Sequence, residues 1–267
     1  MSIHVARDGC RIHYDVVGKG APVLLVPGLG GDGRFWDGVM AWLKDRYRLI
    51  AVDHRGAGRS DRPLGAYRIS GIAADILGIL DQEGVEQAHL VGHSTGGAIV
   101  QSLAIDAPMR CLSTTISGSW ARPDARLRML FAVRSSLLRE GLTTDYQTLT
   151  HVLGHTPEWI EAHEDSLQAA VASAAERLAP LPVTEARIRM LLDFDRYAEL
   201  GRITGPVMVI GAEDDLMIPF RHSAEIAAAI AGARLERLAG GHFHPSTRPE
   251  PFAQLLADFL GRPAVPR

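Results

Sequence analysis

The chain has 267 residues, of which 46% are hydrophobic and 22% are charged, with a formal net charge of −3. This composition is that of an ordinary globular protein, and the slight acidity argues against nucleic acid or an anionic membrane as the main partner. The two cysteines, Cys10 and Cys111, lie far apart without metal-ligand spacing, so we expect free thiols in a reducing, cytoplasmic compartment.

The first half of the chain alternates short apolar runs with helix-like segments, the pattern of a mostly parallel sheet with helices on both faces. Residues 1–10 lack the charged start and apolar stretch of a signal peptide. No apolar run approaches the ~20 residues of a membrane span. Strands are expected at 3–17 (two strands turning at Asp8-Gly9), 22–26, 48–52, 88–91 and 111–117. Helices are expected at 35–44, 69–82 (with Ser70 as candidate N-cap) and 97–107.

Residues 120–203 interrupt this alternation, because no β-rich apolar run appears there. Successive helices are expected at 124–140, 144–153, 158–178 and 183–200. Strands then resume at 206–210 and 234–238, and helices at 221–230 and 251–260. We therefore predict an α/β core formed by residues 1–119 and 204–267, with residues 120–203 inserted as a helical cap or lid.

Ser94 lies in a Gly-x-Ser-x-Gly pattern directly after an apolar run and before a helix-like segment. This arrangement holds a serine at a sharp strand-to-helix turn with its hydroxyl exposed. The flanking residues, Gly92 and Gly96, allow the close backbone approach that such a turn needs. The pattern alone also occurs by chance, and it is the context that makes Ser94 a candidate nucleophile.

Candidate acids and bases follow the last two expected strands. Asp214 and Asp215 come after the first of these strands, and His242 and His244 come after the second. Catalytic groups in open α/β sheets lie at the carboxyl ends of strands. The order serine, aspartate, histidine, each after a separate strand, is the order of α/β hydrolases.

With these residues the chain resembles the α/β-hydrolase superfamily over nearly its whole length. The landmarks are Pro27-Gly28-Leu29-Gly30, the run from Asp53 to Ser60, Gly92 to Gly97, Asp215-Leu216-Met217-Ile218-Pro219 and Gly241-His242. The cap layout and the Asp-Asp-Leu-x-x-Pro run are also similar to enol-lactonases and aminoacrylate hydrolases. The resemblance implies an α/β-hydrolase fold that needs no cofactor and no metal.

The resemblance also implies roles for individual residues. Ser94 would attack a carbonyl carbon while His242 accepts its proton, and Asp215 would orient the imidazole. Asp215 is preferred to Asp214 because the family's acid lies four residues before the proline. The backbone N–H groups of Leu29 and Thr95 would hold the oxyanion.

We expect a small-molecule substrate, namely a carboxylic ester, a lactone or an activated amide, cleaved through an acyl-enzyme. The apolar side chains expected to line its pocket are Trp120, Leu127, Phe131, Trp159 and Met217. Five arginines of the first cap segment either pair with a substrate carboxylate or form a solvated helix face. They are Arg122, Arg126, Arg128, Arg134 and Arg139.

Other functions stay open. A hydrolase of C–C bonds in ring-fission products, or a cofactor-free perhydrolase, would use the same triad, and a non-catalytic receptor would keep the fold without turnover. The run Gly28-x-Gly30-x-x-Gly33, with Asp53 about 20 residues later, also fits a dinucleotide-dependent oxidoreductase. That hypothesis leaves the loops of Ser94 and His242 unexplained.

Several nearby polar residues have simpler interpretations. His244 is a second candidate base, whereas His93 is expected to be structural, and Asp53 and Arg55 are expected to brace a loop. His242 and His244 would supply only half of a metal site. The sequence does not determine the oligomeric state, and a homodimer stays open.

Overall fold

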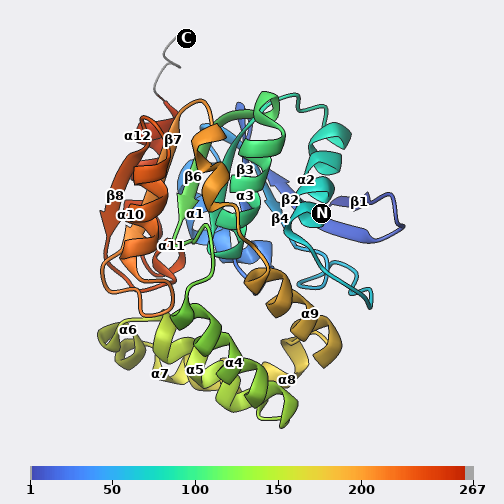
Figure 1. Cartoon of the computed structure of the whole chain (residues 1–267), viewed down its shortest axis with the longest axis vertical. Helices are drawn as coiled ribbons and strands as arrows, with labels where there is room; N and C mark the ends of the chain where they lie inside the picture. The colour runs from blue at the N-terminus through green and yellow to red at the C-terminus, as the bar shows by residue number, and fades with distance from the viewer. Residues whose placement is uncertain (1, 262–267) are drawn as a thin grey trace.

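The computed structural model describes residues 2–261, and Figure 1 shows a sheet flanked by helices with further helices gathered at one end. Within this range eight strands form one sheet in the order β1-β2-β4-β3-β5-β6-β7-β8. The strands are β1 (Ser2–Val5), β2 (Arg11–Val17), β3 (Ala21–Val26), β4 (Tyr47–Val52), β5 (Ala88–His93), β6 (Cys111–Ser117), β7 (Val207–Ala212) and β8 (Arg234–Leu238). β1 and β2 pair antiparallel with their neighbours, and the pairs from β4 to β8 are parallel. The predicted mostly parallel sheet is therefore confirmed, and it brings the carboxyl ends of β5, β7 and β8 to one edge.

Alternate residues of the central strands pack into two separate apolar clusters, one on each face of the sheet. In β3, Val23 and Leu25 join one cluster, while Leu24 and Val26 join the other. Successive strand side chains point to opposite faces, so a strand buried on both sides must be apolar throughout. The helices on one face are α2 (Ile69–Gln82), α3 (Thr95–Asp106) and α10 (Phe220–Ala229), and those on the other are α1 (Asp37–Leu43) and α12 (Pro249–Leu260).

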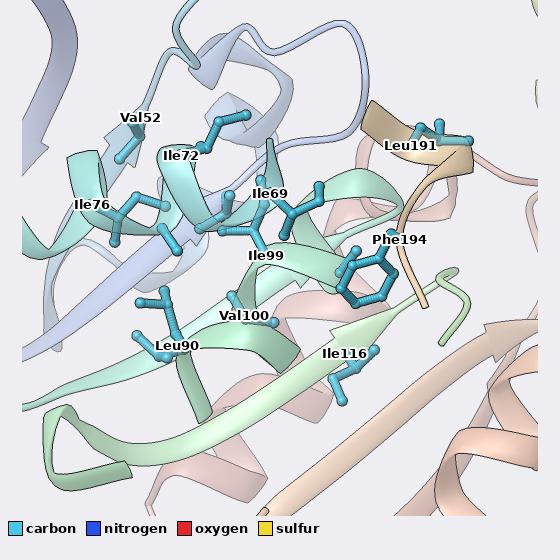
Figure 2. Close-up of a cluster of buried hydrophobic side chains, with 14 of the residues drawn as sticks. Val52, Ile69, Ile72, Ile76, Leu90, Ile99, Val100, Ile116, Leu191 and Phe194 are labelled. Atoms are coloured by element: carbon cyan, nitrogen blue, oxygen red, sulfur yellow. The ribbon is translucent and has the colours of Figure 1, made fainter. Parts of the chain in front are cut away.

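Between β6 and β7 the chain forms a group of helices that we call the cap helices. They are α4 (Ala125–Arg139), α5 (Thr143–Gly154), α6 (Pro157–Ala162), α7 (Glu164–Ala172), α8 (Ala174–Arg177) and α9 (Leu181–Leu192). Figure 1 shows α4 to α8 together below the sheet, with α9 beside them. Leu191 and Phe194 reach the apolar cluster between the sheet and helices α2 and α3 (Figure 2). The apolar core thus continues from the sheet into the cap helices.

Several predicted helices differ from the observed ones. The helix expected at 158–178 is divided into α6, α7 and α8, and the one expected at 183–200 ends at Leu192, before η3 (Tyr197–Arg202). At the first break the imidazole of His163 bonds the carbonyl oxygen of Trp159 at 2.8 Å, which takes the acceptor that the continuing helix would use. At the second break the hydroxyl of Ser173 donates to the carbonyl of Ala169.

The start and end segments of other helices also need correction. Arg68, not Ser70, is the N-cap of α2, and it makes no side-chain capping bond. The helix expected at 35–44 consists of a 3₁₀ turn, η1 (Gly33–Trp36), followed by α1. The structure also has two short helical turns outside the predicted elements, η2 (Pro108–Arg110) and α11 (His244–Thr247). None of the helices within residues 2–261 combines the length and hydrophobicity of a membrane span.

Candidate active site

Ser94 lies between the end of β5 and the start of α3 with a backbone φ of 55°, which makes it the only non-glycine residue with positive φ among residues 2–261. Holding a serine there costs about 1–3 kcal/mol, which the surrounding packing must offset. A Cβ added to Gly96 would lie 2.0 Å from the carbonyl oxygen of Val26, and one added to Gly92 would lie 2.2 Å from that of Gly96. Both glycines of the motif are therefore required by close backbone contact.

Ser94, His242 and Asp215 form a continuous hydrogen-bonded chain. The Ser94 Oγ lies 3.0 Å from His242 Nε2, and His242 Nδ1 lies 2.8 Å from Asp215 Oδ2. With Asp215 ionised, Nδ1–H donates to the carboxylate, and Nε2 is left to accept the serine proton. The second oxygen of Asp215 accepts the backbone N–H groups of Met217 and Ile218 at 2.8 and 2.7 Å. All three triad side chains are buried, so their geometry is fixed by the fold.

Asp214 has a different set of partners. Its carboxylate accepts the backbone N–H groups of Gly240 and Gly241 at 2.9 and 3.1 Å. Those glycines immediately precede His242 in the loop after β8. Of the two neighbouring aspartates, Asp215 bonds the imidazole and Asp214 holds the loop that carries it.

The backbone N–H groups of Leu29 and Thr95 lie near Ser94 and have no acceptor among residues 2–261. The loop that carries Leu29 packs directly on the serine, because a Cβ added to Gly28 would lie 3.2 Å from Ser94 Cβ. A bond from the N–H of Gly31 to the carbonyl of Gly28 closes this turn at 2.9 Å. Free amide donors beside a serine hydroxyl are the groups that an oxyanion requires.

The imidazoles of His93 and His244 lie near the triad, but neither makes a hydrogen bond to the Ser94 hydroxyl. The Ser117 hydroxyl lies 3.2 Å from His93 Nδ1 and 2.8 Å from His244 Nε2, and His244 Nδ1 lies 3.1 Å from the carbonyl oxygen of Gly241. Burial lowers the pKa of His244 to about 4 and lowers that of His93 well below its usual range. Both imidazoles are therefore neutral packing groups near neutral pH, and His244 does not contact Ser94 as a second base would.

A cavity of about 680 Å³ opens onto Ser94 and His242. Of the side chains expected to line it, Trp120, Phe131 and Met217 do so. The predictions for Leu127 and Trp159 are wrong. Leu127 is 1% exposed inside the apolar core, and Trp159 is stacked between two imidazoles with ring centroids 4.0 and 3.9 Å away.

Among the five arginines of the first cap segment, Arg134 lines the cavity. The other four do not line it, and each is held by protein groups. Arg126 and Arg128 donate to backbone carbonyls, Arg139 pairs with Glu185, and Arg122 lies over a tyrosine ring.

Sequence reasoning missed several residues that line this region, namely Phe35, Arg177, Arg187, Leu191 and Phe243. A signal for the buried arginines was present. Arg134 lies on the same helix face as Phe131 and Leu138, and Arg187 lies one turn from Val183 and from Leu191. A charge placed on an apolar helix face is the pattern that could have singled them out.

The glycine-rich loop after β3 has its polar partners within the fold. Asp53 is buried, and its carboxylate accepts the backbone N–H groups of Gly33 and Arg59, each at 2.8 Å, together with the Arg59 guanidinium. Arg55 pairs with Asp75 and Asp8. These bonds occupy the Asp53 carboxylate, which the dinucleotide hypothesis would need free for a nucleotide ribose. Residues 2–261 also contain no group of three or more histidine, cysteine or acidic side chains placed to hold a metal ion.

A serine at a strained strand-to-helix turn, bonded to a histidine and an aspartate from later loops of such a sheet, is the arrangement of α/β hydrolases. Residues 21–249 match the family model of the alpha/beta hydrolase fold. The chain belongs to this family and is a hydrolase.

Individual relatives agree with this assignment. The chain is 35% identical over 254 residues to a protein of Azorhizobium caulinodans named "Putative carbamate hydrolase RutD", covering 94% of this chain and 95% of the relative. Among solved structures it is similar to a hydrolase from Pseudomonas aeruginosa PA01, at 26% identity and a TM-score of 0.87, covering 98% of both chains. It shares the fold of the enol-lactonase from Burkholderia xenovorans LB400, at 24% identity and a TM-score of 0.90, covering 98% of this chain and 100% of that one.

Proposed function

We propose that this hydrolase cleaves small acyl substrates, namely carboxylic esters, lactones or activated amides, through an acyl-enzyme on Ser94. The observation that carries the proposal is the hydrogen-bonded chain from Ser94 through His242 to Asp215 at the wall of a cavity of about 680 Å³. Such a chain activates a hydroxyl that is otherwise a weak nucleophile.

In the first half of the reaction, Ser94 Oγ attacks the carbonyl carbon and its proton passes to His242 Nε2. The carbonyl oxygen becomes an oxyanion, and the N–H groups of Leu29 and Thr95 stabilise it. The intermediate collapses as the bond to the leaving oxygen or nitrogen breaks, and His242 returns the proton to that atom. Asp215 stabilises the imidazolium that exists between the two transfers.

In the second half, a water molecule attacks the acyl carbon with His242 as the base. The bond to Ser94 Oγ then breaks, the serine recovers its proton from His242, and a carboxylic acid leaves. The only co-reactant is water. No step uses His244, Asp214 or a bound metal.

The cap helices serve in this proposal as a lid that selects the substrate. Trp120, Phe131, Arg134 and Leu191 contribute to the cavity from the segment between β6 and β7. Phe243, which follows His242, also lines the cavity, and its ring lies 5.0 Å from the ring of His155 at the end of α5. Movement of the cap helices would therefore reach the loop of His242 directly. A carbamate has a nitrogen atom bonded to its carbonyl carbon. The relatives named as putative carbamate hydrolases therefore support substrates with such a bond among those proposed here.

The test is to trap the acyl-enzyme. A p-nitrophenyl ester mixed rapidly with the protein should release a burst of nitrophenol, and mass spectrometry should find the acyl group on the peptide that contains Ser94. Ser94→Ala should lower kcat by roughly 10³-fold or more and abolish labelling. Ser136→Ala, which changes an exposed serine on α4, is the matched control and should keep full activity. Full activity in Ser94→Ala, or labelling elsewhere, would refute the proposal.

A further inference from the structure

Two arginines on the cap helices are buried without any carboxylate partner among residues 2–261. Arg134 on α4 and Arg187 on α9 are each 5% exposed. Neither guanidinium lies within ion-pair distance of an aspartate or a glutamate in that range. Buried arginines are ordinarily paired, because an isolated charge is costly to remove from water.

The contacts of Arg134 satisfy only part of its guanidinium. Nη2 donates to the Thr150 hydroxyl at 2.9 Å, and Nη1 lies 3.8 Å from the Met217 sulfur. The group lies over the rings of Phe131 and Tyr146, 5.0 and 4.4 Å from the ring centroids. Nε has no partner. Aromatic faces and a sulfur atom orient this cation without neutralising it.

Arg187 is still less satisfied. Its single hydrogen bond within residues 2–261 runs from Nη1 to the carbonyl oxygen of Gly56 at 3.5 Å, while Nε and Nη2 have no partner. Burial lowers the pKa of the Arg187 guanidinium to about 10, so the group still carries its charge at neutral pH. The buried imidazole of His54, which lies beside it, offers no negative charge.

Both arginines line a side cavity of about 260 Å³ next to the main one. The two cavities share wall residues, among them Leu29 of the proposed oxyanion loop, Arg134 and Arg177. Asp32 is the only acidic residue among those lining either cavity, and its carboxylate is bound by the Arg34 guanidinium at 3.0 Å. The walls therefore carry an excess of positive charge beside the proposed site of acyl transfer.

We infer that the substrate cleaved at Ser94 carries a carboxylate group, which Arg134 and Arg187 bind in the side cavity. This inference rests on the proposed function and narrows its substrate class to acyl compounds with a second, ionised acid group. The planar fork of a guanidinium matches the two oxygens of a carboxylate, and a charge-assisted bond in a buried site is stronger than a neutral one. The exposed Arg177 at the shared wall adds attraction for an incoming anion.

The first experiment compares matched pairs of substrates. The p-nitrophenyl monoesters of succinate, glutarate and adipate are tested against neutral esters in which a methyl group replaces the carboxylate. We expect kcat/KM to be at least about tenfold higher for the anionic ester at one or more chain lengths. Arg134→Met and Arg187→Met should each reduce that anionic-to-neutral ratio by about 10- to 100-fold, the range of a charge-assisted hydrogen bond. Arg139→Met, an exposed arginine on the same helix α4, should leave the ratio unchanged.

A second readout separates ligand binding from a structural role. Arg187→Met removes an unpaired buried charge, so its Tm should equal or exceed that of the parent protein. Glutarate should raise the Tm of the parent protein, and it should fail to do so in the Arg134→Met, Arg187→Met double variant. Inorganic phosphate at the same concentration should give a smaller shift.

The inference is overturned if anionic and neutral esters react equally at every chain length, or if the arginine variants lower both rates equally. A fall in Tm for Arg187→Met without a change in the substrate ratio would make the arginine structural. A larger shift with phosphate than with glutarate would overturn the assignment to a carboxylate. In each case labelling of Ser94 by a neutral ester would leave the proposed function standing. If no ester labels Ser94, the proposed function itself fails, and the thermal shifts still report on anion binding.

Discussion

The loops at the edge of the sheet differ from the cap helices in whether their buried charged side chains have partners within the protein. At the sheet edge, Asp215 is surrounded by donors, with one oxygen bonded to His242 and the other to two backbone N–H groups. In the cap helices, Arg134 and Arg187 are as deeply buried but face no carboxylate among residues 2–261. The polar groups of the first region are paired within the protein, whereas the two guanidinium groups of the second are not. In our two proposals the sheet edge supplies the chemistry and the cap helices supply the selectivity.

The largest expected effect separates the two aspartates at the sheet edge. Asp215→Asn should lower kcat by about 10³-fold or more, because an amide that donates to His242 Nδ1 favours the wrong imidazole tautomer. Asp214→Asn should lower kcat by at most about tenfold, since it weakens only the bonds to the loop at Gly240. Steady-state kinetics on one neutral ester measures both. Equal losses in the two variants would remove the distinction drawn between these carboxylates.

The second-largest effect is expected from a substitution at the junction between the sheet and the cap helices. Phe194→Ala should lower the free energy of unfolding by about 3–5 kcal/mol, as expected when a buried aromatic ring is deleted. It should also raise KM, because the same segment carries Leu191 in the cavity wall. Phe252→Ala, in the cluster on the opposite face of the sheet, is the matched control.

Urea unfolding measures the free energy of unfolding of each variant, and ester kinetics measures its KM. The control variant, Phe252→Ala, should lose a similar free energy of unfolding and keep the KM of the parent protein. An unchanged KM in Phe194→Ala would mean that the cap helices keep their place without this junction.

Lowering the pH should lower the free energy of unfolding, because the sheet region contains buried histidines. Burial lowers the pKa of His54, His93 and His244, the last to about 4. In the unfolded chain a histidine titrates near pH 6.5. Below that pH the unfolded state therefore binds protons, whereas these buried imidazoles stay neutral in the folded state. The free energy of unfolding should therefore fall as the pH drops from about 6.5 toward 4, by up to about 1.4 kcal/mol per pH unit for each histidine.

Urea unfolding at pH 7, 6 and 5 measures this slope. His244→Asn should flatten it, and His163→Gln, at an exposed position, should not. Stability that is constant from pH 7 to 5 would contradict the assignment of these imidazoles as neutral packing groups.

The smallest expected effect concerns two aromatic residues of the cap helices. Phe131 lines the cavity, and Phe131→Ala should change kcat/KM by about tenfold, the range for removing part of an apolar pocket. Trp159 is stacked between His155 and His163 outside the cavity, so Trp159→Ala should change kcat/KM by less than about threefold. Kinetics on esters of increasing chain length distinguishes the two. A larger effect at Trp159 would mean that the cap helices rearrange around the substrate.

The sequence by itself determined the sheet and the neighbourhood of Ser94. The strand expected at 111–117 has the bounds of β6, that at 234–238 those of β8, and the helix expected at 69–82 those of α2. Gly92 and Gly96 could be interpreted from the pattern alone, because the clash that a Cβ would make there involves backbone a few residues away or in the adjacent strand. Strands buried on both faces and tight glycine turns leave a local signature, since the requirement acts on consecutive residues.

Only the tertiary structure decided which aspartate meets His242, which cap side chains face the cavity and where the cap helices break. Asp214 and Asp215 are adjacent, and their roles differ only through the loops that surround them. Leu127 and Phe131 share one face of α4, but only Phe131 reaches the cavity. An amphipathic helix specifies that one of its faces is buried, and the neighbour that covers this face comes from a distant part of the chain. For the same reason the helix-face pattern could single out Arg134 and Arg187 as buried, but only the placement of α4 and α9 decided what surrounds each guanidinium.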